Sequence, residues 1–107
     1  MPRESRELRK QRLKSALVNK LEQEKKTENY WYDLVYDYLT LWEIKEKLKI
    51  EIERNGVMIK VENGQQVFRK RNDAIVELPK ISKRMTDILE VLSIKSSDVD
   101  NGEDEEY

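Results

Sequence analysis

The sequence predicts a mainly α-helical chain of three main helical segments, with a small β-hairpin between the second and third segments and a disordered acidic C-terminal tail. Three observations carry this expectation. Apolar residues recur at spacings of three and four in three separate segments, which places them on one face of a helix. One short stretch alternates apolar and polar residues around Asn63-Gly64, as the strands of a hairpin do. The last residues lose both patterns and become acidic.

The composition favours a small binding protein over an enzyme. The 107 residues suit one domain with a small core, and 40% of them are charged, so oligomerisation is expected to complete the core. The chain has no Cys and no His, which removes thiolate nucleophiles, Cys-ligated zinc and the usual general base at neutral pH. Its three Gly are scattered and do not form a phosphate-cradling loop. We therefore expect no catalytic residue, no metal site and no cofactor.

The sequence gives no indication of targeting or of membrane insertion. The first residues contain no apolar stretch typical of a signal peptide, and no run approaches the roughly 20 apolar residues that span a bilayer. Asp33 and Asp37 lie one helical turn apart without a further ligand, and the carboxylates of residues 103–106 fall in the acidic tail, so neither group suggests a metal or acid–base site. An intracellular protein is expected.

Charge is segregated along the chain, although the net charge is only −1. Residues 1–28 hold nine basic and five acidic side chains, residues 56–72 hold four and one, and residues 96–107 hold six acidic and no basic ones. The chain is therefore basic at its start and in its middle, and acidic at its end. We divide it into a basic N-terminal helical segment at 1–28, a helical oligomerisation core at 29–95 and an acidic disordered tail at 96–107.

The first helix is expected over residues 6–25. Leu13, Leu17 and Leu21 recur every four residues and stack on one face, and Ser5 is a suitable N-cap. The first two turns are crowded with cations that suit a phosphate backbone. The alternative is a solvated helix face with intrahelical ion pairs. The candidate DNA-binding residues of this helix are Arg6, Arg9, Lys10, Arg12 and Lys14.

The second helix, over residues 30–54, has the strongest pattern. Either Thr27 or Asn29 is suited to cap it. Its main apolar stripe is continuous, and Tyr30, Leu39 and Ile44 add apolar area on other sides, so burial on more than one side is expected. The helical spacing of the aromatic residues favours core or subunit packing over stacking on nucleic-acid bases. The expected packing residues are Trp31, Leu34, Tyr38, Leu41, Trp42 and Leu48.

The hairpin is expected over residues 57–68, after Asn55-Gly56 ends the second helix. Asn63-Gly64 is expected to form the two-residue turn, with positive φ at both positions. A lone hairpin is marginal in water, so it is expected to lie against the helices or to pair with a neighbouring subunit. The basic run that follows is a solvated linker, a DNA-contacting loop or a salt-bridge partner for a neighbouring subunit. Its candidate DNA-binding residues are Arg69, Lys70 and Arg71.

The third helical segment begins after Asn72, a good N-cap, with Asp73 at the positive end of the helix dipole. Pro79 lies seven residues past the cap, where it removes a hydrogen bond, so it is expected to kink or split the helix. From Ser93 onwards the periodicity is lost and the chain is expected to be disordered. The expected packing residues of this helix are Met85, Ile88 and Leu92.

A recognisable order of features covers about two thirds of the chain. The features are Asn29-Tyr30-Trp31-Tyr32, then Tyr38, Leu41, Trp42 and Glu43, then Asn55-Gly56-Val57, a polar hairpin, a basic residue before Asn72, and the apolar and basic pattern Leu78, Lys80, Lys83, Met85, Ile88, Leu89, Leu92, Ile94 and Ser96. This order resembles the family of small terminase subunits of tailed phages and prophages. Residues 1–28 take no part in the resemblance.

The resemblance implies a non-catalytic part of a genome-packaging motor, in the cytoplasm of a bacterial host. Small terminase subunits form rings, bind viral double-stranded DNA, deliver it to the terminase large subunit and regulate the ATPase and nuclease of that partner. The chain departs from the family pattern in three places. The family often has Asn-Pro where this chain has Asn72-Asp73, lacks a proline at the position of Pro79, and usually has Gly at the position of Ser93.

Two other functions are compatible with the sequence. A small helical adaptor would regulate a partner without touching DNA, and a DNA-binding regulator would act as a dimer. The basic N-terminus favours DNA contact over the adaptor. The dimeric regulator would need a helix-turn-helix, and no pair of short helices has a clear spacing for one.

Overall fold

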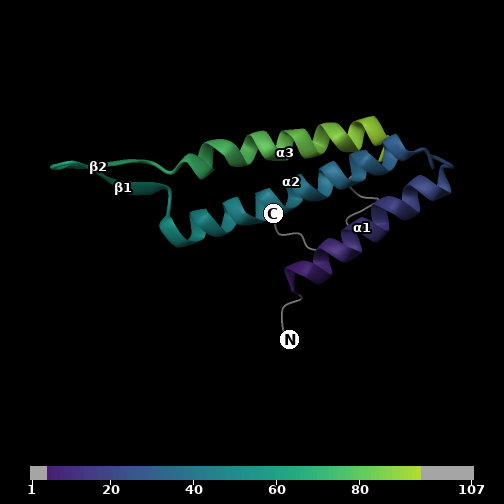
Figure 1. Ribbon diagram of the computed structural model, residues 1–107, viewed down its shortest axis with the longest axis horizontal. Helices are drawn as coiled ribbons and strands as arrows, with labels where there is room; N and C mark the ends of the chain where they lie inside the picture. Colours follow the sequence, from purple (N-terminus) through teal and green to yellow (C-terminus); the bar gives the residue numbers. More distant parts are fainter. Residues whose placement is uncertain (1–4, 95–107) are drawn as a thin grey trace. The chain divides into compact units, whose positions relative to one another are not determined.

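The computed structural model describes residues 5–94 of the chain. In order, the elements are α1 (Arg6–Gln23), α2 (Asn29–Asn55), β1 (Met58–Asn63), β2 (Gln66–Arg71) and α3 (Asp73–Leu92) (Figure 1). The protein is mainly helical, and an antiparallel hairpin connects the second and third helices. The expected helices and hairpin are therefore confirmed. The tail expected at 96–107 lies outside the described residues.

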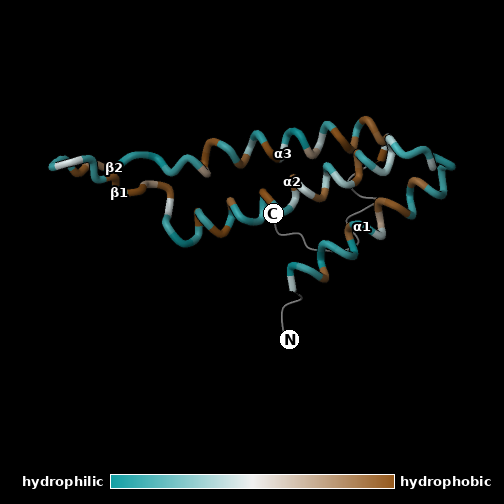
Figure 2. The backbone as a smooth tube through the Cα atoms, viewed as in Figure 1, coloured by the Kyte–Doolittle hydropathy of each residue, from teal (hydrophilic) through white to brown (hydrophobic). Residues whose placement is uncertain are grey.

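The described chain divides into two compact units. The first extends to Thr40 and resumes at Thr86, so it holds α1, the first part of α2 and the last part of α3. Leu17, Leu21 and Leu92 are completely enclosed in it. Figure 2 shows hydrophobic segments recurring along these helices, as amphipathic helices require. The other buried apolar residues of this unit are Val35, Tyr38, Leu39, Leu89 and Ile94.

The second unit, Leu41–Met85, holds the rest of α2, the hairpin and the rest of α3. Among the described residues, its buried apolar side chains are those of Trp42, Ala74 and Met85. Glu46 and Asn72 are also buried here, so this core is smaller and more polar than that of the first unit. The hairpin adds no buried side chain, and Figure 1 shows it projecting beyond the end of α2.

Two of the helix starts are capped as the sequence predicts. The Ser5 hydroxyl accepts a hydrogen bond from the Leu8 amide at 3.1 Å, and so satisfies one free donor of the first turn of α1. At the start of α3, the Asn72 side-chain oxygen accepts from the Ala74 amide at 3.0 Å. By contrast, α2 includes Asn29 as its first residue, so Asn29 lies inside the helix and not before it.

Each helix ends at a residue with positive φ. Gly56 (φ 78°) ends α2, and its amide donates to the Ile52 carbonyl at 2.8 Å. The corresponding residues after α1 and α3 are Lys25 (φ 59°) and Ser93 (φ 60°), neither of which is Gly. A side chain with Cβ is strained in this conformation, so the ends of α1 and α3 carry a local cost that the end of α2 avoids.

The hairpin turn lies one residue later than expected. Asn63 pairs with Gln66, which leaves Gly64 and Gln65 as the loop. Of the two loop residues, both within the described range, Gly64 has a positive φ (64°) and Gln65 does not. A single positive φ at the first loop position is a feature of the type II′ turn, in which Gly is favoured at that position. The expectation of Asn63-Gly64 with two positive φ values was therefore wrong.

Three further expectations change. α3 remains one helix across Pro79, so the expected split is wrong and the expected kink stays a prediction. Ile94 is buried, so the ordered chain continues past Ser93, where disorder was expected to begin. The turn at Ser93 folds Ile94 back, because its amide donates to a carbonyl in the last turn of α3. Of the three residues expected to add burial on other sides of α2, Leu39 is buried, whereas Tyr30 and Ile44 are exposed.

Candidate nucleic-acid interface

The cations predicted on α1 lie on its solvated half. None of residues 6–16 is buried, and the enclosed side chains of this helix, Leu17 and Leu21, come later. The exposed side chains in the N-terminal half of α1 are therefore accessible to a partner. The exposed cations are Arg6, Arg12 and Lys14, and the half-buried ones are Arg9 and Lys10.

These cations do not share one face of α1. Residues four apart lie above one another on a helix, so Arg6, Lys10 and Lys14 form one row. Arg9 and Arg12 are three apart and lie on another side. One strand of nucleic acid passing along the helix can therefore contact only part of its positive charge.

Two features of α1 bear on phosphate binding. Arg6 and Arg9 lie near the positive end of the helix dipole, where a cation is unfavourable by about 0.3–1 kcal/mol and a bound anion offsets the cost. Lys14 already has a partner, because its ammonium lies 5.4 Å from the centre of the exposed Tyr36 ring on α2. The helix dipole therefore favours a bound phosphate at the N-terminal end of α1.

The second predicted basic run is part of strand β2 and not a linker. Arg69, Lys70 and Arg71 are its last three residues, and all six residues of the strand are exposed. The linker interpretation is wrong because the strand continues through the charged residues, which extends the hairpin to 58–71 from the expected 57–68. Successive side chains on a strand point to opposite faces. Arg69 and Arg71 therefore share one face, and Lys70 lies on the other.

The strand register adds a residue that the sequence did not single out. Lys60 on β1 lies directly opposite Arg69, and Met58 lies opposite Arg71. We call this side of the hairpin the basic face; its cations are Lys60, Arg69 and Arg71. Lys60 was missed because it is far from Arg69 and Arg71 in sequence and joins them only through strand pairing. No local pattern would have found it without the register.

The other side of the hairpin, which we call the apolar face, carries Ile59, Val61 and Phe68. Val61 and Phe68 are directly opposite each other. Phe68 remains exposed, whereas Ile59 and Val61 are half-buried. Lys70 also lies on this face, and its ammonium pairs with the Asp73 carboxylate at 3.7 Å in an exposed ion pair.

Asn72 fixes the base of the hairpin within the second unit. Its main-chain amide donates to the Val57 carbonyl at 2.7 Å, and its side-chain amide donates to the Gly56 carbonyl at 2.9 Å and to the Glu51 carboxylate at 3.3 Å. The Asn55 side chain donates to the same Glu51 oxygen at 2.8 Å. Asn72 is buried, and its side-chain bonds to Gly56 and Glu51 are partly protected from water. They join the end of α2, the hairpin and the start of α3.

The residues predicted for core or subunit packing are all at least half-buried. Tyr38, Trp42, Met85 and Leu92 are buried. The half-buried members are Trp31, Leu34, Leu41, Leu48 and Ile88. No copy of the chain is present, so their contribution to subunit contacts stays a prediction.

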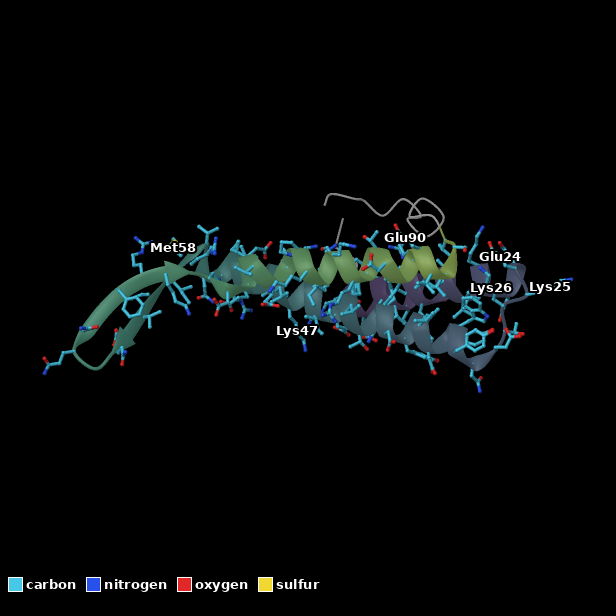
Figure 3. The ribbon with its side chains drawn as sticks, turned by 90° about the horizontal axis from the view of Figure 1, so that it is seen from above. Glu24, Lys25, Lys26, Lys47, Met58 and Glu90 are labelled. Carbon is cyan, nitrogen blue, oxygen red and sulfur yellow. The ribbon has the colours of Figure 1, made fainter. Side chains whose placement is uncertain are left out.

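A second polar cluster lies in the first unit, around Lys26. The Lys26 ammonium donates to the Leu92 carbonyl at 2.8 Å and lies 2.9 Å from the Glu24 carboxylate (Figure 3). It also lies 5.1 Å from the centre of the Trp31 ring. The Trp31 indole N–H in turn donates to Glu28 at 3.1 Å. This cluster joins the end of α1, the start of α2 and the end of α3. We assign it a structural role, because its donors and acceptors are satisfied by one another.

Within residues 5–94, no group of three or more acidic side chains gathers as a metal ligand set, and Asp33 and Asp37 are both exposed. None of the helices in the described range is both long enough and apolar enough to cross a bilayer. Comparisons with models of protein families, with curated proteins and with solved structures found no match to this chain.

Proposed function

We propose that this chain is a phage small terminase subunit: a ring-forming, DNA-binding component that delivers viral double-stranded DNA to the terminase large subunit in the cytoplasm of a bacterial host. On this proposal it catalyses no reaction and regulates the ATPase and nuclease of its partner. The order of sequence features from Asn29 to Ser97 is the origin of the proposal. The arrangement of charge described above supports its DNA-binding part.

The observation that carries the proposal is that both units hold a group of cations outside their buried cores. Arg6 and Arg12 are exposed on α1, and the basic face of the hairpin is exposed on both of its strands. Cations in such positions contribute nothing to core packing, and each phosphate that they neutralise adds a counterion-release term to DNA affinity. The near-neutral net charge of −1 hides both groups.

Two features support assembly into an oligomer. The hairpin is exposed on both faces, and a two-stranded hairpin is marginally stable in water unless it packs against something else. Phe68, on the apolar face, is a large apolar residue with 45% of its surface exposed. Burial of this side chain against another copy of the chain would stabilise both the hairpin and the assembly.

DNA binding is tested by fluorescence anisotropy with a duplex at several salt concentrations. We expect the wild-type affinity to fall steeply as salt rises. Replacement of Arg6, Arg9, Lys10 and Arg12 by Ala should lower the salt slope by about 2, because only one side of α1 contacts a nucleic-acid strand at a time. The matched control replaces Lys25, Lys47, Lys80 and Arg84 by Ala, which removes four exposed cations elsewhere. If the wild-type protein does not bind duplex DNA at low salt, the proposal fails.

The ring is tested by light scattering at low and physiological salt. A closed assembly of many 12.9 kDa copies is the expected result. A dimer that binds DNA would instead indicate the dimeric regulator. A protein that stays monomeric at every concentration would rule out the ring.

A helical adaptor that regulates a partner protein without touching DNA is the second candidate. The exposed Val67 and Phe68 favour it, because apolar side chains on a projecting hairpin suit a protein partner. Lys60 on the basic face argues against it, because protein interfaces are usually depleted of Lys, whereas Arg69 and Arg71 are compatible with either kind of partner. Light scattering and DNA binding together separate this candidate from the terminase proposal.

A further inference from the structure

We propose that the hairpin binds the major groove of double-stranded DNA as a two-stranded ribbon, with Lys60, Arg69 and Arg71 directed at the DNA. This inference rests on the proposed DNA-binding function and assigns the groove contacts of that binding to a particular element and a particular face. It gives a DNA-contacting role to Lys60, which no sequence pattern singled out. It gives no such role to Lys70, although Lys70 lies between Arg69 and Arg71 in the sequence.

The register places the three cations close together. Lys60 and Arg69 are directly opposite, where Cβ atoms of neighbouring strands are about 4.5–5.5 Å apart. Arg71 is two residues further along the same strand as Arg69, about 6.6–6.8 Å away. Like charges directly opposite each other destabilise a sheet, so the free hairpin carries a cost at this pair. A bound anion between the two cations would remove that cost.

The basic face is open to a large partner. Every residue of β2 is exposed, and so are Met58, Lys60 and Glu62 on β1. Glu62 is the one carboxylate of the hairpin strands, and it forms an exposed ion pair of 3.7 Å with Lys60. An exposed ion pair of this kind is weak in water. The hairpin strands hold four cations and one carboxylate, so their net charge is +3.

The shape of the hairpin selects the duplex that it fits. Two paired strands lie about 4.7–4.9 Å apart, and the major groove of B-form DNA, about 12 Å wide, admits a two-stranded ribbon. Arg and Lys are the side chains that pair with the O6 and N7 atoms of guanine on the floor of that groove. The major groove of A-form RNA is too deep and narrow for side chains to read. The hairpin is therefore expected to prefer duplex DNA over duplex RNA.

The base of the hairpin is held firmly enough to present this face in a defined direction. The hydrogen bonds from Asn72 to the Val57 and Gly56 carbonyls tie both strand ends to the helices of the second unit. The loop at Gly64 and Gln65 lies at the far end of the hairpin. A ribbon anchored at its base and free at its tip has the geometry needed to enter a groove.

The test measures DNA affinity of the full chain by anisotropy for four single variants: Lys60→Ala, Arg69→Ala, Arg71→Ala and Lys70→Ala. Each removes one positive charge from the same exposed hairpin, so long-range electrostatics change equally. We expect Lys60→Ala, Arg69→Ala and Arg71→Ala each to weaken binding about 5-fold or more, because a groove contact is worth about 1–3 kcal/mol. Lys70→Ala, on the apolar face, should weaken it less than about 2-fold.

Two further measurements use the wild-type protein and so do not depend on the folding of a variant. Methylation of guanine N7, an atom in the major groove, should reduce DNA binding. A duplex RNA of the same sequence should bind more weakly than the DNA. Circular dichroism verifies that each variant remains folded.

The outcomes separate this inference from the proposed function. Equal losses for all four variants would show general charge attraction and overturn the inference. So would unchanged binding by the three basic-face variants, equal affinity for duplex RNA, or binding that N7 methylation does not affect. In each of these cases the wild-type protein still binds DNA, and the proposed function survives. Absence of wild-type DNA binding would overturn both.

Discussion

The side-chain ammonium of Lys26 donates a hydrogen bond to the main-chain carbonyl of Leu92 at 2.8 Å, across 66 positions of sequence. Leu92 is the last residue of α3, where helix carbonyls have no partner within the helix. A cation at this position also interacts favourably with the negative end of the helix dipole. Lys26 therefore acts as a C-terminal cap for a helix other than the one that it follows.

Lys26→Met should lower the free energy of unfolding by about 1–2 kcal/mol, because the Leu92 carbonyl and the Glu24 carboxylate both lose a charged donor. Met retains most of the aliphatic length of Lys, so packing changes little. Urea denaturation measures the effect. The control is Lys25→Met, which removes the same charge from an adjacent exposed position. Equal stability of the two variants would contradict the role assigned to Lys26.

The end of α3 has the hydrogen bonds of a Schellman motif without the usual Gly. The Ile94 amide donates to the Leu89 carbonyl at 2.9 Å, and the Ser93 amide donates to the Glu90 carbonyl at 3.0 Å. Ser93 has a φ of 60°, which is unfavourable for a residue with Cβ.

Ser93→Gly should therefore raise the free energy of unfolding by about 0.5–1 kcal/mol; the strain relieved exceeds the entropy that Gly adds to the unfolded chain. Thermal melting detects the change. Ser15→Gly is the matched control, because Ser15 is exposed in the interior of α1, where Gly lowers stability. A lower melting temperature for Ser93→Gly would show that the Ser93 side chain makes a contribution larger than its strain.

Asn72 both caps α3 and donates to two acceptors, so its substitutions separate these roles. Asn72→Ala should cost about 2–3 kcal/mol, because it removes the cap and leaves the Gly56 carbonyl without this donor in a partly buried setting. Asn72→Asp keeps a cap acceptor but places a carboxylate beside Glu51. This variant should also be destabilised near neutral pH.

The pH dependence of Asn72→Asp identifies the cause. Burial and the Glu51 carboxylate both favour protonation of the introduced carboxyl group in the folded state, so stability should recover as pH falls. Asn55→Asp also faces Glu51 but is exposed, so its loss should be small. If Asn72→Asp is as stable as wild type near neutral pH, the hydrogen bonds donated by the Asn72 side chain contribute little.

Local sequence patterns predict those elements whose causes are local. Ser5 and Asn72 act within the first turn of the helix that each precedes, and Gly56 ends α2 through its own backbone freedom. The apolar stripes give the helices themselves, because a period near 3.6 requires no knowledge of the partner surface.

The features that the sequence did not predict depend on distant partners. The charged residues Arg69 and Arg71 extend β2 because β1 supplies partners for them, although charged residues alone do not indicate a strand. The pairing of Asn63 with Gln66 displaces the turn by one residue for the same reason. The contact between Lys26 and Leu92 joins two helix ends that no periodicity relates. The sequence therefore predicted that the candidate site is basic. It did not predict which cations share a face, because that depends on strand pairing.

Lys45 should make the stability of the folded protein increase as pH rises, whereas the stability of Asn72→Asp should increase as pH falls. Burial is the main cause that lowers the pKa of Lys45 from 10.5, the positive charge of Lys49 adds to it, and Glu46 opposes it. The folded state therefore disfavours the protonated form. Near neutral pH both states hold the proton, and the folded protein bears the cost of a half-buried ammonium. As pH rises towards 10.5, the folded protein releases the proton before the unfolded chain does, and the cost disappears.

Lys45→Met should therefore melt at a higher temperature than wild type near neutral pH, and its advantage should shrink as pH approaches 10.5. Lys47→Met is the control, because Lys47 is exposed on α2 (Figure 3) and its substitution should show little pH-dependent difference. The quantity to compare is the difference in melting temperature between variant and wild type at each pH, so that titrations common to both proteins cancel. A Lys45→Met variant that melts below wild type near neutral pH would mean that the polar partners of Lys45 outweigh the cost of burying its charge.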